Sequence, residues 1–283
     1  MNHIFLIADS GSTKTDWCVV EKGQPTRLIS TKGMNPFFQT PEEMETEIRE
    51  NLLTKLPSGE FSAVYFYGAG CTPQKAPIVE GVLRKSISVT GEVEVNSDLL
   101  AAARGLCLHQ PGIACILGTG SNSCFYDGEQ IAFNVPALGF ILGDEGSGAN
   151  LGKLLVGDIL KNQLPEELKQ KFFKQFNTDM ADIIERVYRQ PFPSRFLASL
   201  NIFLEENKHI PAIKALLINA FKAFIQRNVM QYDYRSYPMN CIGTIANIYK
   251  EELQEAANAL GVKLGVIAKS PMEGLIKYYT QKK

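Results

Sequence analysis

The chain has 283 residues, of which 45% are hydrophobic and 21% are charged, and its formal net charge is −1. This length allows two domains with separate hydrophobic cores, and the apolar share is ordinary for a globular protein. A net charge so close to zero argues against nucleic acid or a membrane surface as the partner. No apolar run approaches the length of a membrane span, and no basic segment with a cleavable apolar stretch marks a signal peptide.

The cysteines and histidines form no motif typical of a metal site. The six cysteines lie at positions 18, 71, 107, 115, 124 and 241 and form no Cys-x-x-Cys pair. Several fall in apolar segments, so we expect buried free thiols and a cytoplasmic protein. Cys71 differs, because it lies in the glycine-rich stretch Gly68-Ala-Gly-Cys71. The three histidines have no second ligand at metal-site spacing, so no metal-binding motif is predicted.

The first predicted element is a hairpin of two strands around Asp9-Ser-Gly-Ser-Thr-Lys-Thr-Asp-Trp17, with apolar residues on both sides. A turn of small residues exposes backbone N–H groups and hydroxyls that can hold phosphate oxygens. Asp9 adds a carboxylate suited to hydrated Mg²⁺. The candidate phosphate-binding residues are Asp9, Gly11, Ser12, Thr13 and Lys14. An ordinary hairpin turn explains the same residues equally well, because Gly, Ser, Thr and Asp are common in turns.

Strands then alternate with helices through the first half, which predicts an α/β domain with a mixed sheet. Thr40-Pro-Glu-Glu43 has the capping-box pattern of a helix start, and Thr72-Pro73 predicts another. The expected elements are a strand at 28–32, a helix from 40 to about 56, a strand at 63–67, a helix after 73, a strand at 93–97 and a short helix at 99–106.

The second half begins with the same plan. Strands are expected at 113–117, 123–126 and 130–133, and Gly118-Thr-Gly-Ser121 forms a second small-residue turn. Residues 147–235 are then predicted to be a largely helical insertion. A strand at 239–243, a helix at 248–260, a strand at 263–267 and a last helix opened by Ser270-Pro-Met-Glu273 complete the chain.

Two such turns, about a hundred residues apart, indicate two related domains that bind one nucleotide. They do not form a Walker A loop, because Thr13 rather than Gly precedes Lys14. They do not form a Rossmann fingerprint either, because the glycines join strand to strand rather than strand to helix.

With these stretches in view, the chain resembles the acetate kinase, sugar kinase, Hsp70 and actin superfamily, and within it the BadF/BadG/BcrA/BcrD ATPase family with its N-acetylglucosamine kinases. The resemblance rests on Asp9–Trp17, Asn96–Gly105, Leu117–Asn122 and Gly139–Gly148, with a weaker match at Gly243-Thr-Ile-Ala246. It implies two ribonuclease H-like domains around a nucleotide cleft that binds ATP and Mg²⁺. Residues 1–110 would form the first domain, with a helix at 270–283 packed back on it, and residues 111–269 the second.

The resemblance also implies the general base. Asp98 follows the strand Val93–Ser97 at the position of the family's base, which accepts the proton of the acceptor hydroxyl. The spacing allows a second interpretation, in which Asp98 is the N-cap of the following helix, and both roles are compatible.

The remaining candidate site residues also follow from the resemblance. Gly139-Phe-Ile-Leu-Gly-Asp-Glu-Gly-Ser-Gly148 resembles the family's sugar segment, although Ala137-Leu138 replace its usual Gly-Trp. Asn35 is either a sugar contact or a turn residue before Pro36, and the Gly243 turn either meets adenosine or only joins strand to helix. The implied sugar-binding set is Asn35, Asn122, Gly139, Asp144, Glu145 and Ser147, and the implied nucleotide-binding set adds Gly118, Thr119, Gly120, Ser121, Gly243 and Thr244.

The resemblance therefore implies a homodimeric, ATP-dependent kinase acting on a hydroxyl of N-acetylglucosamine or a related amino sugar. The alternative is an ATPase activator of the benzoyl-CoA reductase or hydroxyacyl-CoA dehydratase type, which needs a cysteine-held iron–sulfur cluster. Cys71 would be the one cysteine in a plausible loop for it. A third alternative is a sugar-responsive binding protein without catalysis, and Asp98 argues against it.

Overall fold

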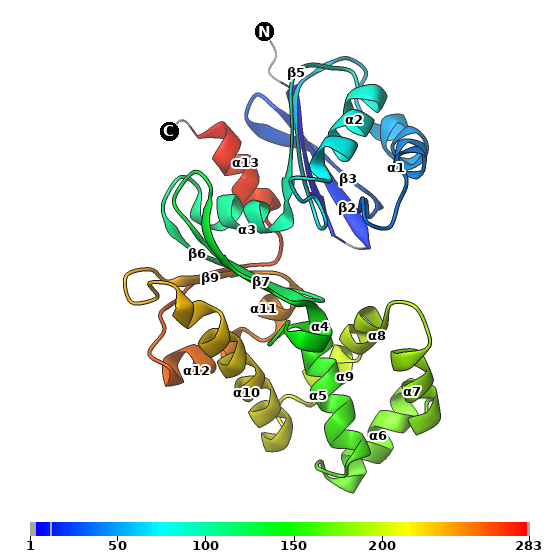
Figure 1. The fold of residues 1–283 in the computed structure, drawn as a ribbon, viewed down its shortest axis with the longest axis vertical. Helices are drawn as coiled ribbons and strands as arrows, with labels where there is room; N and C mark the ends of the chain where they lie inside the picture. The colour runs from blue at the N-terminus through cyan, green and yellow to red at the C-terminus, as the bar shows by residue number, and fades with distance from the viewer. Residues whose placement is uncertain (1–3, 12, 282–283) are drawn as a thin grey trace. The chain divides into compact units, whose positions relative to one another are not determined.

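The structure is a computed structural model that describes residues 4–11 and 13–281. The chain forms two compact units. Unit 1 contains residues 1–110, 128–130 and 271–283, and unit 2 contains residues 111–127 and 131–270. The blue and cyan first third of the chain and the red last helix in Figure 1 therefore belong to the same unit.

Unit 1 is built on a five-stranded sheet with the order β3-β2-β1-β4-β5. β1 pairs antiparallel with β2 and parallel with β4, and β5 continues the parallel side. The strands are β1 (Ile4–Ser10), β2 (Lys14–Glu21), β3 (Gln24–Lys32), β4 (Phe61–Gly68) and β5 (Val89–Ser97). Because β1, β4 and β5 are parallel, their carboxyl ends lie at one edge of the sheet.

Helices cover both faces of this sheet (Figure 1). One face packs against α1 (Pro41–Glu47) and α2 (Ala76–Ser86), in a core that includes Trp17, Met44 and Val79. After α1 the chain continues as a π-helical turn, Ile48–Leu52, and a 3-10 turn, Leu53–Lys55. The other face packs against α3 (Asp98–Cys107) and α13 (Met272–Thr280).

The helix starts only partly follow the predicted caps. Thr40 and Glu43 form the expected capping box. Thr72 caps no helix, because its carbonyl accepts the N–H groups of Lys75 and Ala76 in a turn and α2 begins only at Ala76. The predicted box at the last helix is also wrong, since Pro271 is the N-cap residue and α13 has no side-chain cap.

A polar cluster fixes α13 to the rest of unit 1. The Arg104 guanidinium lies 2.7 Å from both the Glu94 carboxylate and the Tyr67 hydroxyl. The Tyr279 hydroxyl also donates to Glu94, at 3.0 Å, and its ring stacks on Tyr65 with the centroids 3.7 Å apart. The partly buried charges are thus paired, and α13 is tied to α3, β4 and β5.

Unit 2 repeats the sheet of unit 1. Its strand order, β10-β9-β6-β7-β8, has the same pairing senses, with β6 antiparallel to β7 and parallel to β9. The strands are β6 (Gly112–Leu117), β7 (Ser121–Tyr126), β8 (Ile131–Val135), β9 (Met239–Ile242) and β10 (Leu264–Ala268).

Most of unit 2 is helical, and its core is continuous from the sheet into the helices. The helix predicted at 248–260 is α12, which begins at Lys250, and the structure adds a short helix, α11, before it. The helices are α4 (Gly139–Leu142), α5 (Gly148–Leu160), α6 (Glu166–Phe176), α7 (Met180–Tyr188), α8 (Pro193–Ser199), α9 (Asn201–Asn207), α10 (Pro211–Arg227), α11 (Thr244–Ile248) and α12 (Lys250–Ala259), with a 3-10 turn at Val229–Gln231.

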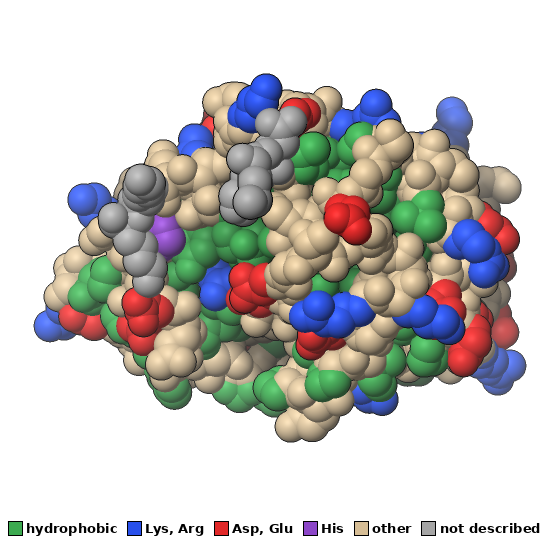
Figure 2. Space-filling model, turned by 90° about the horizontal axis from the view of Figure 1, so that it is seen from above, with side chains coloured by type: hydrophobic (Ala, Val, Ile, Leu, Met, Phe, Trp, Pro, Cys, Tyr) green, Lys and Arg blue, Asp and Glu red, His purple; other side chains and the backbone are tan. Residues whose placement is uncertain are grey.

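The surface carries no large field of one sign on the face shown in Figure 2, where acidic and basic side chains are interspersed. This agrees with the balance of 29 basic and 30 acidic residues. A helix able to cross a membrane is not found in the part of the chain that the structure describes.

The closest approach of two helices in unit 1 generates a test of its packing. A Cβ atom added at Gly274 would lie 1.8 Å from the Gly105 carbonyl oxygen, so α13 crosses α3 at backbone contact. We expect Gly274→Ala to lower the free energy of unfolding by about 1–3 kcal/mol, as overpacking does. Fluorescence of Trp17, the single tryptophan, reports the unfolding of unit 1 because it is buried in that core.

Gly81 in α2 provides the matched control. A Cβ there meets nothing within 4 Å, so Gly81→Ala should stabilise the helix by about 0.5–1 kcal/mol. Equal melting curves for Gly274→Ala and the wild type would contradict the close crossing.

Candidate active site

The predicted site residues of unit 1 gather at the edge where β1, β4 and β5 end. Ser10 pairs with Gly68, and Gly68 pairs with Ser97, so Asp98 follows the last rung of the same ladder. β3 ends at this edge too, because Lys14 pairs with Lys32, and the loop with Asn35 follows. The sheet topology therefore brings residues from four separate stretches together.

Two carboxyl groups at this edge lie in a poorly solvated environment. Burial raises the pKa of Asp9 to about 7, and the negative charges of Asp98 and Asp16 add to the rise while Lys14 opposes it. Burial also raises the pKa of Asp98, and the backbone N–H groups of Asp98 and Leu99 oppose that rise. Like charges that share a site of low polarity are typical of functional carboxylates.

Asp98 is the first residue of α3 rather than its cap. Ser97 is the N-cap, and its hydroxyl accepts the N–H group of Leu100 at 3.3 Å. The interpretation of Asp98 as the N-cap residue is therefore wrong by one position. The Asp98 carboxylate lies in the first turn of α3, where the N–H groups of Asp98 and Leu99 act on it.

Buried hydroxyl groups join the first hairpin to the loop after β3. Ser10 Oγ lies 2.8 Å from Thr15 Oγ1 and 3.0 Å from both the nitrogen and the carbonyl oxygen of Met34. Gly11 and Thr13 are exposed, and Lys14 forms an ion pair of 2.6 Å with Asp16. Ser12, the fourth predicted turn residue, lies outside the described residues.

Asn35 has the hydrogen bonds of a turn residue, which is one of its two interpretations. Its Oδ1 atom accepts the N–H group of Phe37 at 2.9 Å, and its own N–H donates to Gln39. A Cβ atom at Gly70 would lie 2.5 Å from this Oδ1, so Asn35 also lies against the loop after β4. Its Nδ2 group has no partner among the described residues, and a substrate contact stays a proposal.

Cys71 lies close to the same edge but is buried. Burial raises the pKa of its thiol to about 12, with a further contribution from the charge of Asp98. A protonated, buried thiol is a poor metal ligand, because the thiolate is the ligating form.

In unit 2 the predicted residues also gather at one sheet edge, around the turn Gly118–Gly120. The N–H groups of Gly148 and Ala149, in the first turn of α5, donate to the carbonyls of Gly118 and Thr119 at 2.8 and 3.0 Å. The N–H groups of Thr119 and Gly120 donate to no described residue, so they are available to an anion. The turn is thus fixed through its carbonyls while two of its donors are unused.

The carboxylate of Asp144 is packed against this turn. It accepts the N–H group of Ser121 at 3.2 Å, while the Ser121 hydroxyl donates to the Glu145 carbonyl at 2.9 Å. A Cβ at Gly120 would approach Asp144 Oδ2 to 3.0 Å. Burial raises the pKa of Asp144 although the Ser121 N–H and Lys153 lower it. The acidic segment and the turn therefore form one hydrogen-bonded assembly.

The backbone between β8 and α5 is strained. Leu138 has φ +63° and Asp144 has φ +53°, values that side chains other than glycine rarely adopt. Gly139 and Gly146 also have positive φ, and Leu138 is 59% exposed. Leu138 is thus both exposed and in a positive-φ conformation, and such strain is concentrated at functional sites.

Three of the other predicted residues of unit 2 make contacts that stabilise the fold. Ser147 is fully buried and caps α5 by accepting the N–H group of Asn150. Asn122 Oδ1 accepts from the Asn134 side chain at 3.0 Å. A Cβ atom at Gly243 would lie 2.3 Å from the Leu117 carbonyl oxygen, so this glycine permits contact with the base of the second hairpin. Thr244, the first residue of α11, is exposed.

Arg227 is a site neighbour that the sequence did not reveal. Arg227 is the last residue of α10, and its Nε atom lies 2.5 Å from Glu145 Oε1. No local pattern marks it, because the two residues are distant in the chain and meet only through the packing of α10 on α5.

The acidic groups fit a hydrated Mg²⁺ rather than a metal held entirely by the protein. Within residues 4–11 and 13–281, no group of three or more His, Cys, Asp or Glu side chains is arranged to hold a metal. Mg²⁺ keeps several waters and needs only one or two carboxylates beside phosphate oxygens. Asp9, with Asp98 nearby, meets that requirement.

Comparison with known proteins identifies the family. No family model matches the chain. A crystal structure of a candidate N-acetylglucosamine kinase from Porphyromonas gingivalis is 47% identical, covers 98% of each chain and has a TM-score of 0.94. The chain belongs to the N-acetylglucosamine kinase-like proteins of the actin, Hsp70 and sugar kinase superfamily.

Two more distant relatives of this N-acetylglucosamine kinase-like protein agree. A curated N-acetylmuramic acid/N-acetylglucosamine kinase of Clostridium acetobutylicum is 28% identical over 217 residues, which are 68% of this chain and 66% of that protein. A candidate N-acetylglucosamine kinase of Chromobacterium violaceum shares the fold, at 16% identity, 99% coverage of each chain and a TM-score of 0.76. The predicted fold class, α/β with two actin-like ATPase domains, is confirmed.

The raised pKa of Asp9 predicts a pH-dependent stability. The folded state holds the Asp9 proton more tightly than the unfolded state, so the stabilisation is complete below about pH 4 and is lost as the pH rises toward 7. Asp9→Asn keeps the neutral form at every pH. We expect this variant to melt several degrees above the wild type at pH 8, with a much smaller difference at pH 4.5.

The control is Asp182→Asn, because Asp182 is exposed on α7 of unit 2 and is not among the charges that act on Asp9, so no comparable gain at pH 8 is expected. A difference between Asp9→Asn and wild type that does not change with pH would show that Asp9 titrates normally.

Proposed function

We propose that the chain is an ATP-dependent phosphotransferase that transfers the γ-phosphoryl group to a hydroxyl of N-acetylglucosamine or a related amino sugar. The observation that carries the proposal is the near-complete match to a candidate N-acetylglucosamine kinase at 47% identity. Carboxyl groups at the edges of the two sheets support it independently: Asp98 follows β5 in unit 1, and Asp144 is packed against the Gly118–Gly120 turn in unit 2.

In unit 1, Asp98 would act as the general base. Its task is to orient the acceptor hydroxyl and accept its proton as the bond to phosphorus forms. A pKa raised by burial suits this task, because the carboxylate then binds the transferred proton more readily near neutral pH.

In unit 2, Asp144 and Glu145 would accept hydroxyl protons of the sugar in hydrogen bonds. Bonds to charged acceptors are the stronger ones, and a site built for hydroxyls rejects acceptors that lack them. Arg227 would hold Glu145 in place, and Ser121 would hold the backbone of this segment against the turn.

ATP phosphates would be bound by the two turns, through unused backbone N–H groups such as those of Thr119 and Gly120. Mg²⁺, when bound at Asp9, supplies neutralisation of phosphate charge. Gly243 and Thr244 are the proposed adenosine contacts. The remaining predictions are a homodimer in the cytoplasm, membership of the BadF/BadG/BcrA/BcrD family and a domain boundary near residue 110.

The direct test is an ADP-release assay over a panel of amino sugars and hexoses. We expect slow release with ATP alone and a many-fold increase with N-acetylglucosamine, because the bound sugar completes the site. Sugar-independent ADP release accompanied by an anaerobic iron–sulfur chromophore would replace the kinase with the activator. Absence of turnover with measurable sugar binding would favour a binding protein.

Asp98→Asn distinguishes a catalytic role of Asp98 from a role in stabilising α3. This variant should retain ATP and sugar binding and lower kcat by about a hundredfold or more, the usual contribution of a general base. Ser97→Ala is the matched control, because it removes the cap of α3 and should cost about 1 kcal/mol of stability while keeping kcat. If Asp98→Asn turns over like the wild type, Asp98 is not the base.

Gly11→Val and Gly118→Val test the phosphate turns. A Cβ at either glycine meets no described atom closer than 3.8 Å, so the fold should tolerate the side chain while phosphate loses access to the backbone. We expect the KM for ATP to rise at least about tenfold, equivalent to about 1.4 kcal/mol. The KM for the sugar should change much less.

Gly120→Val is a less clean probe of the second turn, because a Cβ there would press on Asp144. It should affect the sugar as well as ATP. Unchanged nucleotide affinity in folded Gly11→Val and Gly118→Val would remove the phosphate assignment from both turns.

A further inference from the structure

A cavity of about 400 Å³ lies among the helices of unit 2. It is lined by α4, α5, α7 and α8, with Ile183 and Leu197 buried beneath it. Ile141 and Tyr188 at its border are 74% and 77% exposed. Its volume is within the range of small-molecule sites, and its lining is mainly apolar, as such sites require.

One wall of the cavity is formed by Gly157 in the interior of α5. A Cβ atom at Gly157 would meet nothing within 4 Å, so the space beside it is open, as it is at Gly81 of α2. Gly152 on the same helix differs, because its Cβ would lie 2.0 Å from the Leu197 carbonyl oxygen. The helix therefore packs closely against α8 at Gly152 and leaves room at Gly157.

The lining contains a single charged residue, Lys153. Its Nζ atom donates to the Phe140 carbonyl at 2.8 Å, which places the ammonium group beside α4. An ammonium group has three donors, and this bond uses one. The cavity thus combines apolar walls with a cation that has donors to spare, which is complementary to an apolar body with an anionic head.

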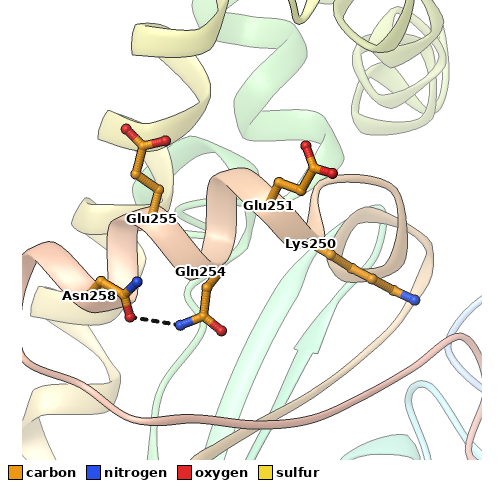
Figure 3. Close-up of a pocket in the computed structure, with 5 residues that line it drawn as sticks. All are labelled: Lys250, Glu251, Gln254, Glu255 and Asn258. Carbon is orange, nitrogen blue, oxygen red and sulfur yellow. Dashed lines mark hydrogen bonds between the residues drawn. The ribbon is translucent and has the colours of Figure 1, made fainter.

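A second cavity, along α12, differs from this one because every residue that lines it is polar. It is lined by Lys250, Glu251, Gln254, Glu255 and Asn258, with a hydrogen bond of 2.8 Å between Gln254 and Asn258 (Figure 3). These polar side chains project from one helix, and Glu255 is further paired with Lys214. None of the residues that line this second cavity is hydrophobic, unlike most of those that line the cavity beside α5.

We propose that the cavity between α4, α5, α7 and α8 binds a small apolar carboxylic acid. The hydrocarbon body lies over Gly157 between Ile183 and Leu197, and the carboxylate pairs with Lys153. The pairing is charge-assisted, and burial of the body supplies the apolar contribution to affinity. The cavity adjoins the proposed sugar segment, because Phe140 and Ile141 belong to that segment and Lys153 acts on the pKa of Asp144. The proposed ligand takes no part in phosphoryl transfer.

Octanoate is the probe, used with the full chain and followed by isothermal titration. We expect saturable binding with a dissociation constant below about 10 mM, the weak but measurable range. Methyl resonances of Ile141, Ile183 and Ile184 should shift on titration, because these side chains line the cavity, whereas Ile7 and Ile29 of unit 1 should not. Absence of saturation, or shifts confined to other isoleucines, would overturn the proposal.

Gly157→Leu fills the cavity from its own wall and should weaken octanoate binding at least about tenfold. The change should not unfold the chain, since the new side chain enters open space. Gly81→Leu on α2 is the matched control, because that helix-interior glycine also faces open space and lies in unit 1. Equal octanoate affinity of Gly157→Leu and Gly81→Leu would overturn the assignment.

1-Octanol tests the charge requirement with the same hydrocarbon body. We expect it to bind several-fold more weakly than octanoate to the wild type, and to lose affinity in Gly157→Leu as octanoate does. Octanol that binds as tightly as octanoate would remove Lys153 and the carboxylate from the proposal.

Discussion

The parallel alignment of β1, β4 and β5 is the constraint from which the site of unit 1 follows. It forces the residues after Ser10, Gly68 and Ser97 to emerge at one edge, and so brings Asp9 and Asp98 near each other in a poorly solvated place. Holding two carboxyl groups in this way costs stability once both are ionised. A fold selected for stability alone would replace one of them, so the arrangement indicates that the charges serve a ligand.

Unit 2 also has a small-residue turn at one edge of its sheet, but other contacts hold that turn in place. Its sheet has the same strand order and pairing senses, yet its turn is fixed by the first N–H groups of α5, by the close approach of Gly243 and by the Ser121 hydroxyl, which donates to the Glu145 carbonyl. In unit 1 the equivalent support is Ser10 with Thr15 and Met34. The two turns therefore share a backbone pattern but are held by different neighbouring segments.

The sequence predicted what depends on neighbouring residues. The strands, both turns and the Thr40 capping box follow from local patterns and agree with the structure. The error at Asp98 was of one residue, because Ser97 and Asp98 are both good caps and only the backbone decides between them. The pattern at Ser270 suggested a box, but α13 begins after Pro271 with no side-chain cap.

What the sequence could not predict depends on packing between distant segments. The contact of Arg227 with Glu145 exists because α10 packs on α5, and the raised pKa of Asp9 depends on its burial and on Asp98 from a distant stretch of the chain. The left-handed Leu138 is equally invisible to patterns, since leucine carries no preference for positive φ. Site geometry of this kind becomes visible only with coordinates.

The position of α13 in the chain has a consequence for biosynthesis. The ribosome completes the five strands of unit 1 early, but Met272 and Leu275, which cover Phe5 and Ile7, are made only after the whole of unit 2. During that interval one face of the nascent sheet lacks its cover and is open to non-native association. The native structure of unit 1 is completed only when the residues of α13 have left the ribosomal exit tunnel.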